Sequence, residues 1–586
     1  MIFAPSTAQA NEVNANEQTQ EVVIPGEQVA QFALSNPPAG FDPVRNTEMI
    51  DAIMQRQVLE CLTEYDYLKQ DATVVGQLAK SWSVSKDGLQ WRIFLNPEAR
   101  FYDPFEPSLW PTGSRPVTAH DVLYSWLRQA DARSNSQGFW AMDGIFLGME
   151  DFRTATGALD PAVAEKAMAN ALKDGIAGIQ VVSDLELLLR LEQPDPKLLN
   201  RLAMSYFAVY PFEAVTKDGR SMRDEPVGSA PFSVQYWLPE QTLLLQRTPD
   251  WRKEVSPFGD GALLPYLDRV EFHVVRDVHT RNEMFKAGTI GRIAVGNSAR
   301  NQFLNERNEL DQEFQERGVR LLDYQRADTT MLCFGMEDPI IGDLPGDPQG
   351  NAKRKLLRRA LALAFPYDRW HADIRQHFPS TPARSFLPPL VPGAEQLPAS
   401  AWNHLDLKLA AKLLEQAGYP EGRGLPELEF LLSGTDTVSM STGDLFVASL
   451  KRIGVKCKAV PMTYPEQLAR SRGGDAQMFL RAWVLDWPDG ALVLQNFHGP
   501  QANTGVNLSR FMDPDFDSLF EQYRALPEGE ERYALLLRMH MLLEDLVPAV
   551  AIDHRRARLL VQPWLENFYV HPFNAFFCKY YRVENH

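Results

Sequence analysis

A single acidic residue, Asp486, stands between two tryptophans at the end of an apolar run. The run, Met478 to Leu485, is rich in Trp, Phe and Val, which is typical of a strand. Pro488 and Gly490 then interrupt the chain. A carboxylate here can cap the turn, or it can bind a cation if the strand ends at a cleft. On residue types alone, a capping role is the simpler interpretation.

No enzyme motif accompanies this acid. The sequence contains no GxSxG, P-loop, GxGxxG or HExxH pattern, and its eleven histidines are scattered. Asp513, Asp515 and Asp517 resemble the start of a calcium loop, but Ser518 and Arg524 occupy the positions that need Gly and Glu. A turn that caps the next helix fits them better. We therefore expect no catalytic residue, no metal site and no cofactor.

Composition narrows the class of protein. A chain of 586 residues is expected to form two to four domains. The net charge of −17 argues against nucleic-acid binding, which needs clustered Lys and Arg. No apolar run reaches the roughly 18 residues that a membrane span requires.

The N-terminus predicts secretion. Ala8-Gln9-Ala10 fits a signal-peptidase site, and residues 11–22 are polar, so 1–22 is interpreted as a signal remnant and disordered leader. A coincidental Ala-rich start is the alternative. No cysteine lies near residue 10, which favours a soluble periplasmic protein over a lipid-anchored one.

Four cysteines are present: Cys61, Cys333, Cys457 and Cys578. Their wide spacing excludes a compact zinc site of the CxxC type. One pair could be bridged in an oxidising compartment, and the sequence does not say which.

Short motifs in the first half of the chain occur in a distinctive order. They are FDP (41–43), LAxSW (78–82), SxDG (85–88), RxxL (92–95) and PVTAxDV (116–122). The series resembles the N-terminal half of the family 5 extracellular solute-binding proteins, which include the oligopeptide- and dipeptide-binding proteins of bacterial ABC importers.

The second half continues the resemblance, which covers nearly all of residues 28–580. Its motifs are VGSAPF (227–232), RTPDW (247–251), LDRVEFH (267–273), FKAGTI (285–290), RALALAFPYDR (359–369) and LLEQAGY (413–419). Two departures stand out. Gly291 replaces the usual Asp, and Pro366 is expected to end or kink its helix.

The resemblance implies a two-lobed α/β periplasmic-binding-protein fold (type II, cluster C) with an extra small domain on lobe one. Lobe one would comprise 23–45, 201–327 and 551–586, the small domain 46–200, and lobe two 328–550. The chain would cross between the lobes near 327 and 550, and these crossings would form the hinge.

By the same resemblance, Asp486 falls on the acid that pairs with a peptide's α-ammonium group. Trp487 replaces the family's Tyr, Val484 its Cys and Ala482 its Gly, and no role is carried over to Arg481. A bound peptide would pair with the backbone of the strand that ends here. The expected ligand-binding residues are Asp486, Trp483, Val484, Leu485, Trp487, Leu34, Ser35, Asn36, Asn503 and Asn507.

We therefore expect a periplasmic, monomeric protein that captures oligopeptides by lobe closure and delivers them to an ABC permease, without chemistry. One alternative keeps the fold and changes the ligand to an oligosaccharide, an opine, haem or a nickel chelate. A remote alternative is a secreted hydrolase that uses Asp486 with a second carboxylate such as Asp489.

Overall fold

The structure is a computed structural model. It describes residues 26–45, 48–69, 71–217, 219–375, 379–502, 505–574 and 576–584. The expected signal remnant and leader over 1–22 and the expected ligand contact Asn503 lie outside the described residues.

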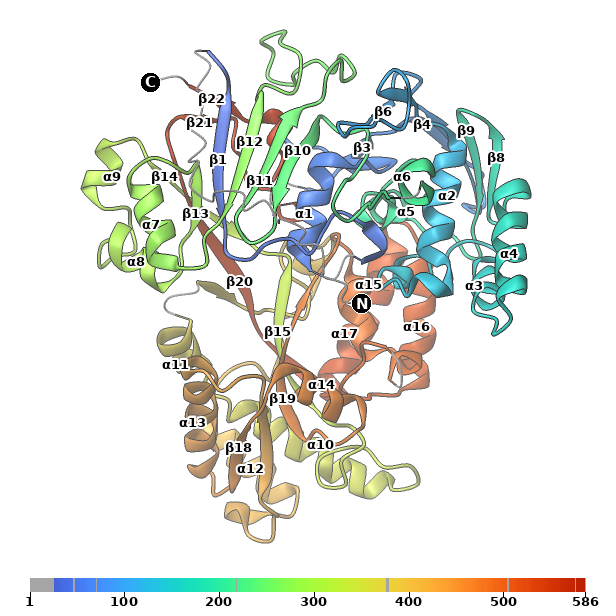
Figure 1. The fold of residues 1–586 in the computed structure, drawn as a ribbon. Coiled ribbons are helices and arrows are strands. Elements are labelled where there is room, and N and C mark those ends of the chain that lie inside the picture. The colour runs from blue at the N-terminus through green and yellow to red at the C-terminus, as the bar shows by residue number, and fades with distance from the viewer. Residues whose placement is uncertain are drawn as a thin grey trace, which may run out of the picture.

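One lobe is built on a four-stranded sheet in the order β1-β12-β11-β10 (Figure 1). β1 and β12 are parallel, and the other two pairs are antiparallel. The apolar positions of β1 alternate into the core, where the rings of Phe32 and Phe272 stack at 5.6 Å. The elements are β1 (Val29–Leu34), β10 (Phe232–Leu238), β11 (Thr242–Arg247), β12 (Arg269–Val274), α7 (Val278–Lys286), α8 (Asn297–Phe303) and α9 (Gln312–Glu316).

A smaller domain lies beside this lobe and contains its own antiparallel sheet, in the order β4-β5-β9-β8. A hairpin turn at Ser85–Gly88 joins β4 to β5, and a capping box of Thr118 and Asp121 opens α2. The elements are α1 (Met49–Val58), β2 (Thr63–Tyr65), β3 (Val74–Gly76), β4 (Ala79–Val84), β5 (Gln90–Leu95), β6 (Arg100–Tyr102), β7 (Ser114–Pro116), α2 (Ala119–Ala130), α3 (Met149–Thr156), α4 (Pro161–Asp174), β8 (Ile179–Ser183), β9 (Glu186–Arg190), α5 (Leu198–Leu202) and α6 (Glu213–Thr216).

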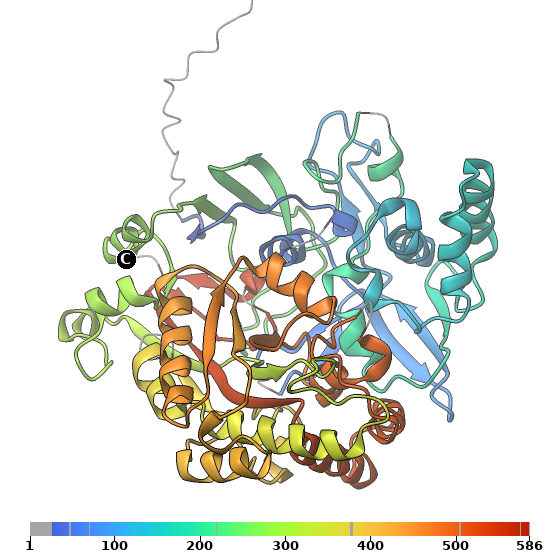
Figure 2. The same ribbon diagram turned by 90° about the horizontal axis from the view of Figure 1, so that it is seen from below.

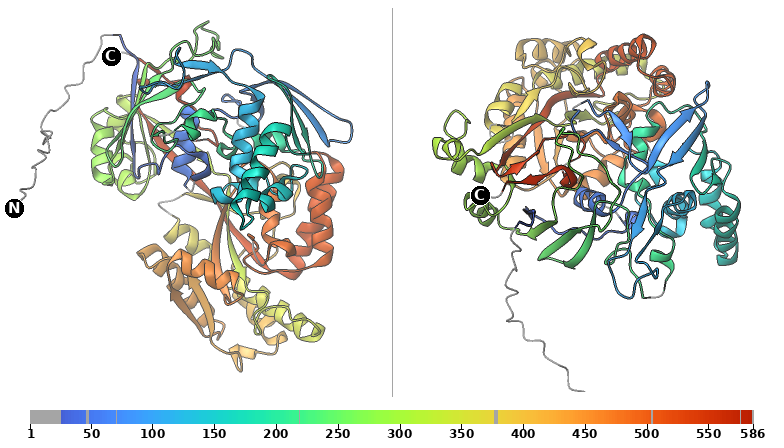
Figure 3. Two further views of the ribbon diagram at one scale, coloured as in Figure 1. Left: turned by 45° about the vertical axis from the view of Figure 1, so that its right-hand side comes forward. Right: turned by 90° about the horizontal axis from the view of Figure 1, so that it is seen from above.

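The second lobe is formed by helices packed on the far end of an eight-stranded sheet. Six of its strands follow the order β13-β20-β15-β19-β17-β18, and the other two, β14 and β16, pair with β20. β17 and β18 pair in parallel and are connected through α13, which makes a β-α-β unit. Its elements are β16 (Ser380–Pro382), α10 (Pro348–Leu363), α11 (Tyr367–Arg369), α12 (Leu407–Gln416), β17 (Leu428–Leu432), α13 (Thr437–Lys451), β18 (Cys457–Pro461), α14 (Tyr464–Arg472), β19 (Met478–Val484), α15 (Gly490–Leu494), α16 (Pro514–Ala525) and α17 (Glu530–Leu546). Figure 2, seen from below, has this yellow-to-orange segment in front, and the left view of Figure 3 shows most of it below the green and blue segments.

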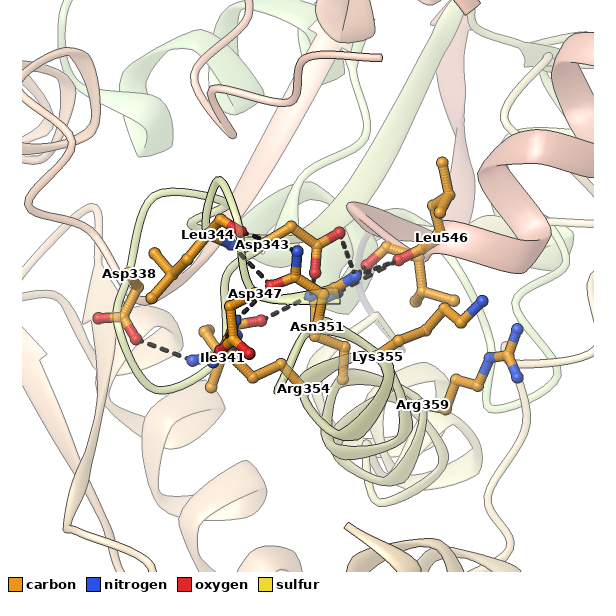
Figure 4. Close-up of polar contacts among 12 residues, drawn as sticks. Asp338, Ile341, Asp343, Leu344, Asp347, Asn351, Arg354, Lys355, Arg359 and Leu546 are labelled. Atoms are coloured by element: carbon orange, nitrogen blue, oxygen red, sulfur yellow. Dashed lines mark hydrogen bonds and ion pairs between the residues drawn. The ribbon is translucent and has the colours of Figure 1, made fainter. Parts of the chain in front are cut away.

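Buried Arg358, in α10, connects the loop that contains Ile341 to the end of α17 in the second lobe. Its guanidinium donates to the carbonyl of Ile341 at 2.7 Å and to both carboxylate oxygens of Asp343 at 3.0 and 3.1 Å. It also donates to the Leu546 carbonyl at 2.6 Å, at the end of α17. Figure 4 shows the loop over residues 338–347, which contains Ile341 and Asp343, against the first turns of α10. An arginine without exposed surface is stable here because all of its donor groups are directed at acceptors.

Two strand connections join the lobes. β14 (Arg320–Gln325) leads into β15 (Asp328–Phe334), and β20 (Ala549–Val561) runs the other way. β20 pairs with β15 and β16 through residues 549–555, and with β14 and β13 (Arg292–Ala294) through residues 556–561. The change of partner therefore comes near residue 555, inside one continuous strand. The division into lobes at 327 and 550 stays a prediction at the level of single residues.

The last described segment returns to the first lobe through β21 (Leu565–Glu566) and β22 (Arg582–Val583). The four cysteines are free thiols, and Cys61, Cys333 and Cys578 are buried. In the part of the chain that the structure describes, no helix combines the length and apolarity needed to cross a bilayer.

Candidate functional site

A cavity of about 440 Å³ opens where the two lobes and the small domain meet. Its wall includes residues of α1, the crossing between β14 and β15, the segment after β19, and the C-terminal segment. They are Glu48, Met49, Ala52, Ile53, Arg56, Met204, Ser205, Tyr206, Tyr324, Arg326, Ala327, Val484, Asp486, His571, Pro572, Phe573 and Asn574. A solute in this cavity would touch both lobes at once.

Asp486 is the acid in this cavity with an unengaged carboxylate. It follows β19, and the Leu485 N–H donates to the Ala327 carbonyl at 2.8 Å, which fixes the chain just before it. The Tyr65 hydroxyl donates to the backbone carbonyl of Asp486 at 3.2 Å. The Asp486 side chain is exposed and makes no hydrogen bond or ion pair with any residue that the structure describes. It does not cap the turn.

The surroundings of Asp486 disfavour its charge. The side chain touches the water of the cavity, but protein encloses that water on several sides. This desolvation raises the pKa of the Asp486 carboxyl to about 6, although the positive charges of Arg56 and Arg201 lower it. A cationic group that entered the cavity would relieve the penalty by pairing with the carboxylate.

Aromatic rings pack next to Asp486. The Tyr65 and His571 rings lie 5.1 Å apart, and His571 Nδ1 accepts from the Phe573 N–H at 3.2 Å. Burial and the charge of Arg56 lower the pKa of His571 to about 4, so the ring is neutral at neutral pH. Asp486 therefore faces neutral rings and guanidinium groups, without a titrating histidine.

The edge of β19 offers free backbone groups next to this acid. β15 pairs with β19 along its whole length, from Phe334↔Met478 to Asp328↔Val484. β17 pairs with the other edge only at Met478 and Phe479. Residues 480–484 therefore have no strand partner on that edge within the described ranges. An extended ligand can add a strand here.

Leu34, Ser35 and Asn36 lie in a neighbouring cavity of about 350 Å³. Leu34 is buried, while Ser35 and Asn36 are exposed just after β1 ends. Glu48, Met49 and Ile53 line both cavities, so the two spaces are adjacent. The structure thus brings Leu34, Ser35 and Asn36 near the space that Val484 and Asp486 line.

Four expected ligand contacts do not line either cavity. Leu485 and Trp487 are buried, and Trp487 packs against Arg201, whose guanidinium lies 4.8 Å from the ring centroid. Trp483 is half-buried beneath Arg481, at 4.7 Å, and its indole N–H is buried without a partner in the described chain. Asn507 is also absent from the lining.

The side-chain amide of Asn507 holds its own loop. It donates to the carbonyls of His498 and Phe511, at 3.1 and 2.7 Å. It accepts from the Ser509 hydroxyl at 3.0 Å and the Phe511 N–H at 3.2 Å. With no exposed surface, Asn507 shapes the loop after the acid and does not reach the cavities.

Asp489 does not form a catalytic pair with Asp486. Its carboxylate is buried, accepts from the Ala491 N–H at 2.8 Å and pairs with Arg532 at 2.7 Å. It caps α15 and neutralises a buried guanidinium. Glycosidase chemistry needs two carboxylates facing one bond, and this acid faces the interior.

Comparison with known proteins identifies the family. Residues 73–505 match the model of the bacterial extracellular solute-binding proteins, family 5 (middle). The chain belongs to this family.

Family 5 relatives match along nearly the whole chain. The protein named Probable di/tripeptide-binding protein 5 of Pseudomonas aeruginosa (strain UCBPP-PA14) is 24% identical over 552 residues, with 92% of each chain covered. Heme-binding protein A of Haemophilus influenzae (strain ATCC 51907 / DSM 11121 / KW20 / Rd) is 22% identical over 560 residues, with 92% of this chain and 90% of that one covered. The solved structure of MppA, a periplasmic murein tripeptide-binding protein in its unliganded open form, has a TM-score of 0.70 at 18% identity and covers 96% of this chain and 98% of its own. The predicted two-lobed α/β fold is thereby confirmed.

Several residues around Asp486 were not expected from the sequence. Arg56, Tyr65, Tyr206 and His571 surround Asp486 but lie hundreds of residues away or have no motif. Arg56 sits in a helix with the ordinary apolar spacing of a core helix, and the signal for its position comes only from packing. An alignment of ligand-facing positions would be needed to find them from sequence.

Proposed function

We infer that this protein is the periplasmic solute-binding component of an ABC importer and that it captures short peptides. The observation that carries the proposal is the unpaired Asp486 carboxylate beside the free edge of β19. The Pseudomonas relative named for di/tripeptide binding supports this ligand class. In the proposal the protein acts as a monomer and binds without chemistry.

Binding would begin at the peptide's N-terminus. Its ammonium group donates charge-assisted hydrogen bonds to Asp486, in a cavity that raises the value of such bonds by excluding water. The peptide main chain then pairs with the edge of residues 480–484 and with Ser35 and Asn36 on the opposite side. Backbone pairing is independent of side-chain type, so many sequences are accepted.

Peptide binding would favour closure of the two lobes. Val484 and Asp486 lie on the second lobe, while Ser35 and Asn36 lie on the first, so a peptide between them stabilises the closed arrangement. The strands that cross between the lobes, β14–β15 and β20, are the proposed hinge. The permease would recognise the closed form.

Titration of purified, ligand-stripped protein with alanine peptides tests the proposal. Asp486→Asn should weaken binding of Ala-Ala-Ala by about 1.5–3 kcal/mol, or about 10- to 150-fold, the typical value of a charged hydrogen bond. N-acetyl-Ala-Ala-Ala should bind wild-type protein with a similar loss. Equal affinity for the free and acetylated peptides would reject the ammonium anchor.

The same variant separates peptides from other family 5 ligands. An uncharged oligosaccharide has no cation for Asp486, so Asp486→Asn would leave its affinity nearly unchanged. Native mass spectrometry of the unstripped protein identifies any ligand that is retained from the cell. Release of amino acids or sugars from a substrate by the purified protein would overturn the proposal that no chemistry takes place.

A further inference from the structure

Arg292 is a guanidinium without a polar partner at the back of the ligand cavities. It is the first residue of β13 and lies opposite Val561 of β20. Its guanidinium carbon lies 3.9 Å from the ring centroid of Phe576. Across the ranges that the structure describes, it makes no hydrogen bond and no ion pair, and burial lowers the pKa of Arg292. A cation that is partly removed from water without an acid is costly unless an anion joins it.

The other residues around the cavity of about 350 Å³ supply apolar surface, engaged polar groups and the small neutral side chains of Ser35 and Asn36. Met49, Ile50, Ile53 and Val278 supply apolar surface. The second arginine of the lining, Arg281, donates to the backbone carbonyls of Val275 and Arg276, at 2.6 and 2.8 Å.

The other polar side chains of this cavity are neutral or already hold a partner. Ser35 and Asn36 are neutral and exposed. Asn282 donates to the Ser298 hydroxyl at 3.1 Å, and the carboxylate of Glu48 accepts from a backbone N–H in the first turn of α1. Arg292 is therefore the guanidinium of this lining that has no acceptor among the described residues.

We propose that Arg292 receives a carboxylate of the bound peptide, so that the peptide lies between Asp486 and Arg292. This inference rests on the proposed function. A guanidinium binds a carboxylate through two parallel hydrogen bonds, which suits the chain terminus of a peptide. Glu48, Met49 and Ile53 line both cavities, so a ligand anchored at Asp486 can extend into the Arg292 cavity without leaving the protein surface.

Two other arginines near the cavities are less suited to this role. Arg56 donates to the Ala203 carbonyl at 3.0 Å and shares its cavity with Asp486, whose charge offsets its own. Arg481 donates to the Val506 carbonyl and stacks on Trp483. Arg292 alone among these three donates to no acceptor in the described residues.

The two anchors belong to different lobes. Asp486 follows β19 of the second lobe, and Arg292 opens β13 beside the first lobe's β1. A zwitterionic peptide would connect them, and closure would bring each charge of the ligand to its counter-charge. A ligand with only one of the two charges would bind one lobe and favour closure less.

Calorimetric titration with a small peptide set tests this. The probes are Ala-Ala, Ala-Ala-Ala and Ala-Ala-Ala-Ala, each with a free C-terminus and as the C-terminal amide. The protein variants are wild type, Arg292→Gln, Arg292→Lys and the control Arg307→Gln, an exposed arginine of the same lobe without a side-chain hydrogen bond or ion pair to the described residues.

Wild-type protein should bind the best free peptide about 10- to 100-fold more tightly than its amide. Arg292→Gln should lose the same factor for the free peptide and should no longer distinguish it from the amide. Arg292→Lys should recover part of the preference, and Arg307→Gln should behave as wild type. Melting temperatures of all variants show whether each is folded.

A tripeptide amide with a glutamate side chain, Ala-Glu-Ala-amide, separates a terminal carboxylate from a side-chain one. Full rescue by this peptide would assign Arg292 to an acidic side chain of the ligand and overturn the terminal assignment. The carboxylate proposal as a whole is wrong if wild type binds free peptides and amides equally while Asp486→Asn still loses binding. If no alanine peptide binds wild type, the proposed function itself fails and the inference fails with it.

Discussion

The hydroxyl of Tyr65, in β2 of the small domain, donates a 3.2 Å hydrogen bond to the backbone carbonyl of Asp486. The bond joins the acid to a part of the chain 421 positions away. The side chain that is proposed to bind the ammonium group is therefore positioned from outside its own lobe.

Removal of this bond should weaken binding without unfolding the protein. We expect Tyr65→Phe to reduce the affinity for Ala-Ala-Ala by about 0.5–1.5 kcal/mol, or about 2- to 10-fold, because a neutral hydrogen bond is lost and the Asp486 backbone is freed. The matched control is Tyr67→Phe, since the Tyr67 hydroxyl donates to the Asn567 carbonyl away from the cavity. It should alter the melting temperature and leave affinity unchanged. Calorimetry that shows equal affinity losses in both variants would contradict a positioning role for Tyr65.

Peptide affinity should fall in mild acid. The pKa of Asp486 is raised to about 6, and only the ionised carboxylate pairs with an ammonium group, so affinity for Ala-Ala-Ala should be about tenfold lower at pH 5 than at pH 7.5. The peptide's ammonium group, with a pKa near 8, is mostly protonated even at pH 7.5, and His571, with a pKa of about 4, stays neutral.

The stability of the unliganded protein should change with pH in the opposite direction. A raised pKa means that the folded chain prefers the neutral Asp486, so its contribution to stability is present at low pH and is lost as pH rises through about 6. Asp486→Asn should abolish both pH dependences. Titrations at several pH values check the first, and a pH-independent affinity in wild type would show that Asp486 does not titrate in binding.

Two acids only three positions apart should respond in opposite ways to the same change. Asp489→Asn removes the shorter of the two ion pairs of Arg532, a guanidinium with no exposed surface that keeps its pair with Glu528 at 3.0 Å, so the free energy of unfolding should drop by about 1.5–3 kcal/mol. Asp486→Asn removes an unpaired charge and should keep or raise stability. Urea unfolding of ligand-free protein measures both. A similar loss in the two variants would mean that Asp486 is a structural acid as well.

The sequence predicted the elements that depend on local pattern. An apolar run predicted β19, and similar local patterns mark β1 and the start of α2 at Thr118 and Asp121. Most of β20 carries no such pattern, because only residues 547–552 look like a strand. The charged stretch from His554 to Arg558 is held as strand by ladder partners and by acids far away in the sequence, such as Asp323.

For the candidate site, too, local sequence pattern indicates only some of the residues. Asp486 could be singled out because its neighbours in sequence are unusual, and Val484 because a strand alternates its faces. Asn507 was expected in the cavity, but four hydrogen bonds within its own loop hold it inside. Arg292 has no local pattern at all, and its lack of partners appears only once the chain is folded.

Asp328 should be essential to the crossing between the lobes. Its buried carboxylate accepts from the Arg555 backbone N–H at 3.0 Å and from its Nε at 2.8 Å, and it pairs with Arg326 at 3.1 Å. It thus joins the two strands where β20 changes partner. Asp328→Asn keeps one acceptor oxygen but loses the charge, so the free energy of unfolding should fall by about 1–3 kcal/mol.

The control for this hinge acid is Asp323→Asn on the same stretch of chain. Asp323 pairs with Arg556 and Arg558 at 2.8 and 2.9 Å, but these side chains are partly exposed. Solvent screening should limit its loss to less than about 1 kcal/mol. Urea midpoints of the unliganded variants compare the two. Because Asp328 lies in the proposed hinge, its variant should also change the affinity for Ala-Ala-Ala, whereas Asp323→Asn should not. Equal midpoints and equal affinities would place the bend elsewhere along β20.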